Sequence, residues 1–430
     1  MSKFKMLVAL SMLGYDFFRV SDEPHAANVH RVRAPWEQYE AALDHRRFIK
    51  RFRVSKEIFH KVLEGIGAEI ERDAEKAQRA GSDVICKEWR LAITLRLLAG
   101  GRPCDIADIA HIHEVMVWKI VHEVCAAINR TFPIRKYDFS DIPRMEEIEK
   151  GFAARSGGVY RGCVGALDGC ALRIRRPTLA DSGENPTVYY NRKGFYAINM
   201  QAVCDSAKRF LYLDLSCPCS THDSTAWGVT SRARALADGE LDERFFVAGD
   251  EAYKTGESMV TPWPGRNLGV KKDSFNFWRT CCVKFIALRY LLHVCVSFSD
   301  SNSRINIECC FGIFHQRWGI FWRPLDCKLS NVKAIVFTCA ILHNMLIDNG
   351  ISEGRIYHEK GDGGGVCPPF VECGASDENG EMQWMEATLT EEQKNLNARE
   401  LRSCRKRARI TEDLHAAGLR RPAHSLWSQQ

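Results

Sequence analysis

Three acidic residues in three different local settings constrain this chain more than any other feature. Asp168 and Asp250 each end an apolar run with the composition of a buried strand, and Glu308 lies in a segment with helical spacing. Carboxylates supply the hard oxygen ligands that Mg²⁺ prefers. Two such ions, about 4 Å apart, can bind the attacking and the leaving oxygen of a phosphoryl transfer. The pattern therefore predicts an α/β domain in which these residues converge on metal ions.

Composition fits a soluble globular chain that is long enough for two domains. The 430 residues are 45% hydrophobic and 27% charged, and the net charge of +6 permits contact with nucleic acid without demanding it. The 18 cysteines are scattered and include no Cys-x-x-Cys pair, so we interpret most as buried thiols in a reducing compartment. Residues 1–35 are expected to form an N-terminal segment, in which residues 1–14 only faintly resemble a signal peptide.

No membrane partner is expected. The longest apolar candidate for a membrane span, residues 283–298, is interrupted by Lys284, Arg289 and His293. Charged side chains are costly in lipid, so this segment does not suit a bilayer.

Residues 36–150 are expected to form an all-α domain that resembles a helix-turn-helix unit. Apolar periodicity predicts helices at 36–51 and 55–70, and two more helices are expected at 87–98 and 115–128. Ser55 can cap the second helix, and residues 100–110 contain a turn and a short helix. In this layout the last helix would lie in the major groove. Candidate DNA contacts near its start are His111, His113 and Lys119. A protein-binding helical bundle is the alternative, because the last helix is rather apolar.

From about residue 158 the pattern changes to strands. Strands are expected at 160–167, 171–175, 194–205, 209–215, 244–248 and 258–262, and helices at 224–236, 304–318 and 333–349. Asp168-Gly169 is interpreted as the tight turn of the first hairpin. The order of elements predicts a ribonuclease-H-like core over residues 158–349, preceded by the helical domain. In such a core the first carboxylate lies on the first strand, and the second ends the strand after the first helix.

Residues 350–430 are expected to form a flexible tail, because the chain there becomes rich in glycine and then polar. One helix is expected near residues 390–410. Its basic residues are Arg399, Arg402, Arg405, Lys406, Arg407 and Arg409. Such a cluster suits a nuclear-import signal or a contact with phosphates, and a solvated helix face is the alternative. We expect the protein in the nucleus.

Several blocks of the sequence, in this order, resemble the signature blocks of PIF/Harbinger transposases. These are DDE-type nucleases of the DDE superfamily endonuclease group. The blocks begin at Gly165-Ala166-Leu167-Asp168-Gly169, Tyr189-Tyr190-Asn191-Arg192-Lys193, Ser220-Thr221-His222-Asp223, Gly249-Asp250-Glu251-Ala252-Tyr253, Arg304-Ile305-Asn306-Ile307-Glu308 and Leu342-His343-Asn344. The resemblance covers roughly residues 85–349.

The resemblance implies a ribonuclease-H-like core in which Asp168, Asp250 and Glu308 bind two Mg²⁺ or Mn²⁺ ions. The implied reaction cuts DNA at a transposon end and joins the freed 3′-hydroxyl to target DNA. The implied partners are transposon-end and target DNA, a Myb-like accessory protein and further copies of the chain.

Other positions receive roles from the same resemblance. Asn191, Arg192 and Lys193 form a basic corner that could hold a DNA phosphate, with a hairpin turn as the alternative. His222 could position a water or a phosphate. Asp223 is expected to cap the first core helix, and a metal-ligand role in place of Asp250 is the alternative.

Two arginines are further candidates for DNA contact. Arg304 stands one helical turn before Glu308, so it could orient that carboxylate or bind DNA. Arg317 lies in a segment that mixes aromatic and basic residues, and a place in the core is the alternative there.

The sequence departs from the family pattern at residues 279–302, which are apolar and Cys-rich. They lengthen the interval between Asp250 and Glu308, and we interpret them as an insertion, such as a translated intron. A genuine extra helix is the alternative. Displacement of Glu308 by this segment would leave a catalytically impaired derivative that only binds DNA or protein. A cellular nuclease of the same fold is a third interpretation.

Overall fold

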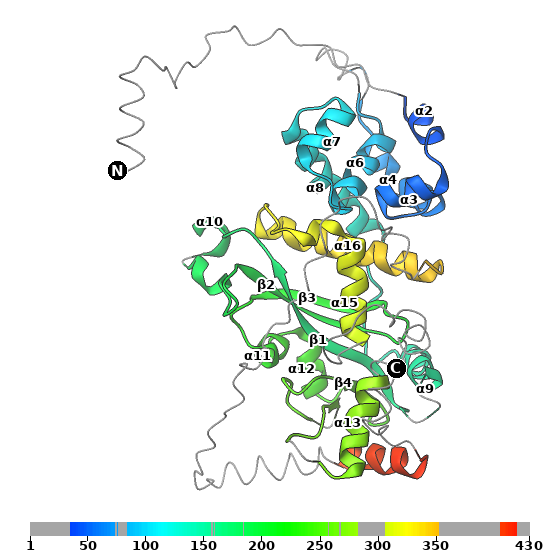
Figure 1. The fold of residues 1–430 in the computed structure, drawn as a ribbon, viewed down its shortest axis with the longest axis vertical. Helices are drawn as coiled ribbons and strands as arrows, with labels where there is room; N and C mark the ends of the chain where they lie inside the picture. Colours follow the sequence, from blue (N-terminus) through cyan, green and yellow to red (C-terminus); the bar gives the residue numbers. More distant parts are fainter. Residues whose placement is uncertain are drawn as a thin grey trace, which may run out of the picture.

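The computed structural model describes residues 35–73, 75, 84–155, 158, 160–183, 185–256, 258–265, 268–282, 306–351 and 405–418. Side chains are described for these residues except 277–282 and 306–309. A helical region occupies one end of the molecule and a mixed sheet lies below it (Figure 1). Helix α16 (Leu329–Asp348) lies between these two parts, and helix α13 (Val270–Cys282) is at the opposite end (Figure 1).

The helical region forms around an aromatic cluster. Its helices are α2 (Trp36–Ala41), α3 (His45–Phe52), α4 (Lys56–Ile70), α6 (Lys87–Leu98), α7 (Pro103–Ala110) and α8 (Glu114–Thr131). Trp36 stacks on Phe59, with ring centroids 5.2 Å apart, and meets Trp89 edge-on. Ser55 caps α4 as predicted, because its hydroxyl accepts from the Ile58 amide at 3.4 Å.

The expected single helix over residues 36–51 is two helices. Asp44 interrupts it in an extended conformation, and its carboxylate accepts from the Arg47 amide at 2.7 Å. Aspartate favours this capping position over a helix interior, so a new helix begins at His45.

Helices α7 and α8 are joined by the short connection that the sequence predicts. His111 takes a left-handed conformation (φ 50°) at the end of α7. The His113 ring accepts from the Val115 amide at 3.3 Å and so caps α8. His111 and Lys119 are exposed, whereas entry of α8 into a DNA groove stays a prediction.

Five strands form a mixed sheet. They are β1 (Cys163–Arg173), β2 (Ala197–Cys204), β3 (Phe210–Pro218), β4 (Phe246–Ala248) and β5 (Met259–Val260), in the order β3-β2-β1-β4-β5. The β1–β2 and β2–β3 pairs are antiparallel, and the β1–β4 and β4–β5 pairs are parallel. This mixed α/β arrangement is compatible with the expected nuclease core.

The predicted turn at Asp168-Gly169 is wrong. Strand β1 continues through both residues, with Asp168 opposite Ala202 and Gly169 opposite Gln201. An Asp-Gly pair favours a turn only locally, and pairing along the length of β2 overrides that preference. Glycine is needed for another reason, because a Cβ at position 169 would lie 2.2 Å from the Asp223 carboxylate.

Helices cover both faces of the sheet. One face meets α15 (Asn306–Arg317), and the other meets α11 (Asp223–Gly228), which is followed by α12 (Ser231–Ala237). The expected helix over residues 224–236 is therefore divided, and Thr230 caps its second half. The remaining elements are α9 (Ile142–Arg155), α10 (Leu179–Ser182) and the 3-10 helices η1 (Pro186–Tyr189) and η3 (Gly319–Trp322).

Helix α16 joins the helical region to the sheet. The Asn129 side chain donates to the Ala334 carbonyl at 2.9 Å and accepts from the Thr338 hydroxyl at 3.0 Å. In length and composition α16 is the one described helix that could cross a membrane, and 56% of its apolar window is buried within the protein. Core helices of soluble proteins have the same properties.

Residues 405–416 are helical and packed on the core, and residues 390–404 of the helix expected near 390–410 lie outside the described residues. Arg407 is buried, lies 4.0 Å above the Trp263 ring and donates to the Pro262 carbonyl at 2.9 Å. Lys406 donates to the Phe245 carbonyl at 2.7 Å. Two members of the predicted basic cluster therefore hold this helix in place, whereas Arg399 and Arg402 lie outside the described residues.

We expect Gly169→Ala to lower the free energy of unfolding by about 2 kcal/mol, because the added methyl overlaps the Asp223 carboxylate. Urea denaturation followed by circular dichroism measures this change. Gly228→Ala is the matched control, since nothing lies within 4 Å of its Cβ. Equal stability of the two variants would contradict this packing of β1.

Candidate active site

The parallel pairing of β1 and β4 brings Asp168 and Asp250 to the same level of the sheet. Ala166 is opposite Ala248, and each aspartate follows its alanine by two residues. Neighbouring strands lie about 4.8 Å apart, so the backbone at Asp168 lies beside the segment that carries Asp250. Asp168 is half-buried and Asp250 is exposed. Asp168 lies in the middle of β1 and Asp250 lies two residues past the end of β4, so the two predicted acidic residues are close along the paired backbones.

Backbone amides orient both carboxylates. The Gly169 amide donates to Asp168 Oδ1 at 2.7 Å, and the Ala252 amide donates to Asp250 Oδ1 at 2.9 Å. Such bonds restrict side-chain rotation while leaving further oxygen lone pairs for a cation. The pair thus offers the oxygen ligands that suit Mg²⁺ or Mn²⁺.

Position 308 lies in the first turn of α15, on the helix face that also carries Phe311 and His315. The His315 Nε2 atom is 3.6 Å from the Cys170 sulfur on β1. Cys170 and Asp168 project from the same face of β1, because side chains alternate along a strand. The backbone therefore places position 308 on the side of α15 that meets the Asp168 face. The Glu308 side chain and the whole of Arg304 lie outside the described residues.

Asp223 lies against the opposite face of β1, beneath Gly169. It is buried, and its Oδ1 accepts from the amide groups of Asn199 (2.9 Å) and Gln201 (2.8 Å). Burial raises the pKa of Asp223 to about 6, the negative charge of Asp250 adds to that rise, and the two amide donors oppose it. Asp223 is thus electrostatically coupled to Asp250.

The expected capping role of Asp223 is wrong. The N-cap of α11 is His222, which is exposed and makes no side-chain capping bond. Asp223 is the first residue of the helix, and side-chain amides from β2 occupy its oxygen instead. These partners are distant in sequence, so local capping rules do not reveal them.

Sequence reasoning missed a buried polar network behind the carboxylates. The Tyr253 hydroxyl donates to Gln201 Oε1 at 2.7 Å, and Gln201 donates to both Asn199 and Asp223. The network joins the turn after Asp250 to β2. The available signal was the pair of polar residues two positions apart, Asn199 and Gln201, within an otherwise apolar strand.

The basic corner divides into a structural residue and two exposed cations. Asn191 is buried, and its Oδ1 accepts from the amides of Lys193 (2.9 Å) and Phe195 (3.4 Å). It therefore holds a turn, as in the alternative interpretation, and offers DNA little surface. Arg192 and Lys193 are exposed.

Arg317 does not suit the predicted DNA contact. Its side chain is fully buried, and it donates to the Ile351 carbonyl at 2.7 Å and lies 3.3 Å from His343 Nδ1. Burial, with the Arg317 charge next in importance, lowers the pKa of His343 to about 3, so this histidine is neutral. Arg317 thus ties α15 to the end of α16 within the core.

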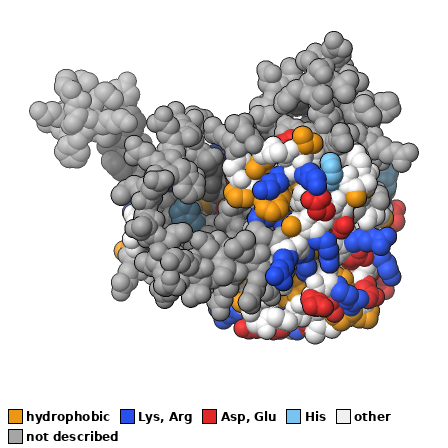
Figure 2. All heavy atoms as spheres, turned by 90° about the horizontal axis from the view of Figure 1, so that it is seen from below, with side chains coloured by type: hydrophobic (Ala, Val, Ile, Leu, Met, Phe, Trp, Pro, Cys, Tyr) orange, Lys and Arg blue, Asp and Glu red, His pale blue; other side chains and the backbone are white. Residues whose placement is uncertain are grey.

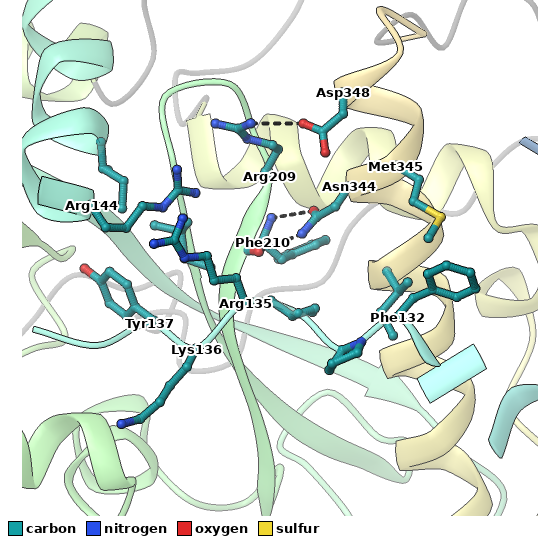
Figure 3. A pocket seen from close by; sticks show the side chains of 15 residues that line it. Phe132, Arg135, Lys136, Tyr137, Arg144, Arg209, Phe210, Asn344, Met345 and Asp348 are labelled. Carbon is teal, nitrogen blue, oxygen red and sulfur yellow. Dashed lines mark hydrogen bonds and ion pairs between the residues drawn. The ribbon is translucent and has the colours of Figure 1, made fainter. Parts of the chain in front are cut away.

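At two other places on the described surface, basic side chains lie among acidic ones. A cavity of about 280 Å³ lies between residues 132–137, β3 and α16 (Figure 3). Its cations all have carboxylate partners: Arg135 with Asp141, Lys136 with Asp138, Arg144 with Glu147, and Arg209 with Asp205 and Asp348. The face seen from below likewise mixes basic and acidic side chains (Figure 2). Neither place forms a purely basic groove.

Comparisons with known proteins support the chemistry of this site. Residues 167–286 match the family model described as DDE superfamily endonuclease. This range contains Asp168, Asp223 and Asp250 and ends before Glu308. The chain is also similar to "Protein ALP1-like" from Arabidopsis thaliana, with 20% identity over 327 residues, 72% of this chain and 73% of the relative. No solved structure matches the chain.

The match supports a DDE endonuclease domain that contains Asp168 and Asp250. Among the described residues, no group of three or more His, Cys, Asp or Glu side chains could hold a metal. A complete three-carboxylate site therefore depends on Glu308, whose side chain lies outside that set.

We expect acid to stabilise the metal-free protein through Asp223. Its folded pKa is raised, so folding takes up a proton as the pH falls through about 6, and the gain is complete below the unfolded pKa. The quantity to compare is the free energy of unfolding of the wild type minus that of Asp223→Asn, both in EDTA. This difference should rise by about 1 kcal/mol when the pH is lowered from 7 to 5. Urea titrations at both pH values measure this difference. A constant difference would show that Asp223 has an ordinary pKa.

Proposed function

We propose that this protein is a DDE-type DNA endonuclease of transposase origin, which cuts and joins phosphodiester bonds with two divalent metal ions. The observation that carries the proposal is the parallel pairing of β1 with β4, which places Asp168 beside the segment that carries Asp250, two residues past β4. The family match over residues 167–286 supports the same chemistry.

In this proposal three carboxylates bind two cations. Asp168, Asp250 and Glu308 would hold these ions through their carboxylate oxygens. Divalent ions at this place would supply activation of a water and stabilisation of the leaving oxygen. The Gly169 and Ala252 amides hold the two aspartates in orientation. The Tyr253–Gln201 hydrogen bond anchors the turn that follows Asp250.

The finer assignment to PIF/Harbinger transposases rests on the sequence blocks and on the ALP1-like relative. In this proposal the protein acts in the nucleus on transposon-end and target DNA, as a homo-oligomer with a Myb-like accessory protein. Arg192, Lys193 and His222 are exposed and available for phosphate contacts, and Arg304 is a further candidate. His111 and Lys119 would contact DNA if α8 enters the major groove.

The second candidate function is DNA or protein binding without catalysis. One observation favours it: the endonuclease match ends at residue 286, within residues 279–302 and before Glu308. An intact Asp168–Asp250 pair favours the active enzyme.

We expect Asp168→Asn to lower Mg²⁺-dependent nicking of DNA that carries the source element's ends by about a hundredfold or more. The reason is that the variant loses a carboxylate ligand for the cations. A gel assay of labelled duplex, with the Myb-like partner present, measures nicking. Asp238→Asn is the control, since Asp238 is exposed at the end of α12. Circular dichroism checks that both variants fold. Wild-type nicking by Asp168→Asn would reject the assignment.

We expect mature transcripts to lack codons 279–302 if that segment is a translated intron. A form without the segment would then nick DNA faster, because the interval between Asp250 and Glu308 would have a usual DDE spacing. Transcript sequencing tests the first point. Uninterrupted coverage of these codons in mature message would contradict the intron interpretation.

A further inference from the structure

Among the residues that the structure describes, two arginines in the helical region lack the carboxylate partners that the basic residues around the cavity of Figure 3 have. Around that cavity every cation has a carboxylate partner within ion-pair distance. In the helical region, Arg51 on α3 and Arg96 on α6 line a second cavity of about 180 Å³. Within the described part of the chain, neither makes an ion pair with a carboxylate. The second cavity therefore carries uncompensated positive charge.

The wall of this second cavity is apolar. Helices α2, α3, α6 and α7 contribute Tyr39, Phe52, Trp89, Ile93, Ile106 and Ile109. Ile109 is 49% exposed, which is high for a large aliphatic side chain. The cavity thus presents apolar surface beside charge to solvent.

The two guanidinium groups influence one another. Arg51 donates to the Tyr39 hydroxyl at 2.5 Å and lies 5.6 Å from the centre of that ring. Burial lowers the pKa of Arg96, the like charge of Arg51 lowers it further, and Tyr39 and Asp105 oppose the shift without pairing with it. Two neighbouring cations against an apolar wall are favourably neutralised by an anion, which would accept charge-assisted hydrogen bonds from both.

We propose that this cavity binds a partner protein through a glutamate or aspartate that stands beside an apolar residue on the partner's helix. The carboxylate would lie between Arg51 and Arg96, and the apolar side chain would pack against Trp89 and Ile109.

A protein fits this cavity better than duplex DNA. Aromatic residues and arginine are enriched at the centres of protein interfaces. A phosphate backbone would neutralise the arginines but has no apolar group for the wall. The proposal concerns the helical region and does not rest on cleavage at Asp168, so the two can fail separately.

The probe is a fluorescein-labelled amphipathic peptide of roughly 16 residues, long enough to form a helix, with leucines on one stripe and glutamates beside them. The matched probe carries glutamine in place of each glutamate. Fluorescence anisotropy with the full-length protein should give about tenfold tighter binding of the glutamate peptide, because only carboxylates form charge-assisted bonds.

Variants locate the binding site. Arg51→Gln and Arg96→Gln should each weaken binding of the glutamate peptide about fivefold and leave the glutamine peptide unchanged. Arg130→Gln is the matched control, since Arg130 is an exposed arginine of the same region that pairs with Glu69. Thermal unfolding confirms that each variant folds.

Any one of four results would overturn the proposal. One is absence of saturable binding, and another is equal affinity for the two peptides. The third is that Arg51→Gln and Arg96→Gln behave as Arg130→Gln does. If duplex DNA displaces the peptide and both cavity variants lose DNA affinity, the site is a nucleic-acid contact and the protein partner is rejected.

Discussion

Parallel pairing of β1 with β4 is the constraint on which the rest of this molecule depends. It places Asp168 and Asp250 at the same level along the two strands, although these residues are far apart in the chain. Both strands are buried, so register is set by apolar packing on both faces. A slip by one residue would turn one carboxylate to the other face of the sheet and separate the two aspartates.

Contacts on the opposite face of β1 support the position of the two aspartates. Gly169 leaves room for Asp223, whose carboxylate receives two amide donors from β2. Tyr253 extends the network to the turn after Asp250. A buried network whose members are all paired is rigid, whereas the loss of one member leaves unsatisfied polar groups. The polar residues of β2 therefore hold Asp223 and the turn that follows Asp250.

Short sequence patterns correctly predicted the features that neighbouring residues determine. Ser55 caps its helix, α6 spans the expected residues, and the β2–β3 hairpin forms where two apolar runs flank a polar turn. Predictions failed where distant residues decide. Pairing with β2 carries β1 through Asp168-Gly169, and burial against His343 and Ile351 removes Arg317 from the surface. Arginine composition alone does not reveal which cations pack in the core.

Anomalous diffraction from crystals grown with Mn²⁺ tests the central claim most directly. The account predicts two peaks roughly 4 Å apart, bounded by oxygens of Asp168, Asp250 and Glu308. Peaks elsewhere, or well-defined density with Glu308 turned away from both aspartates, would contradict it.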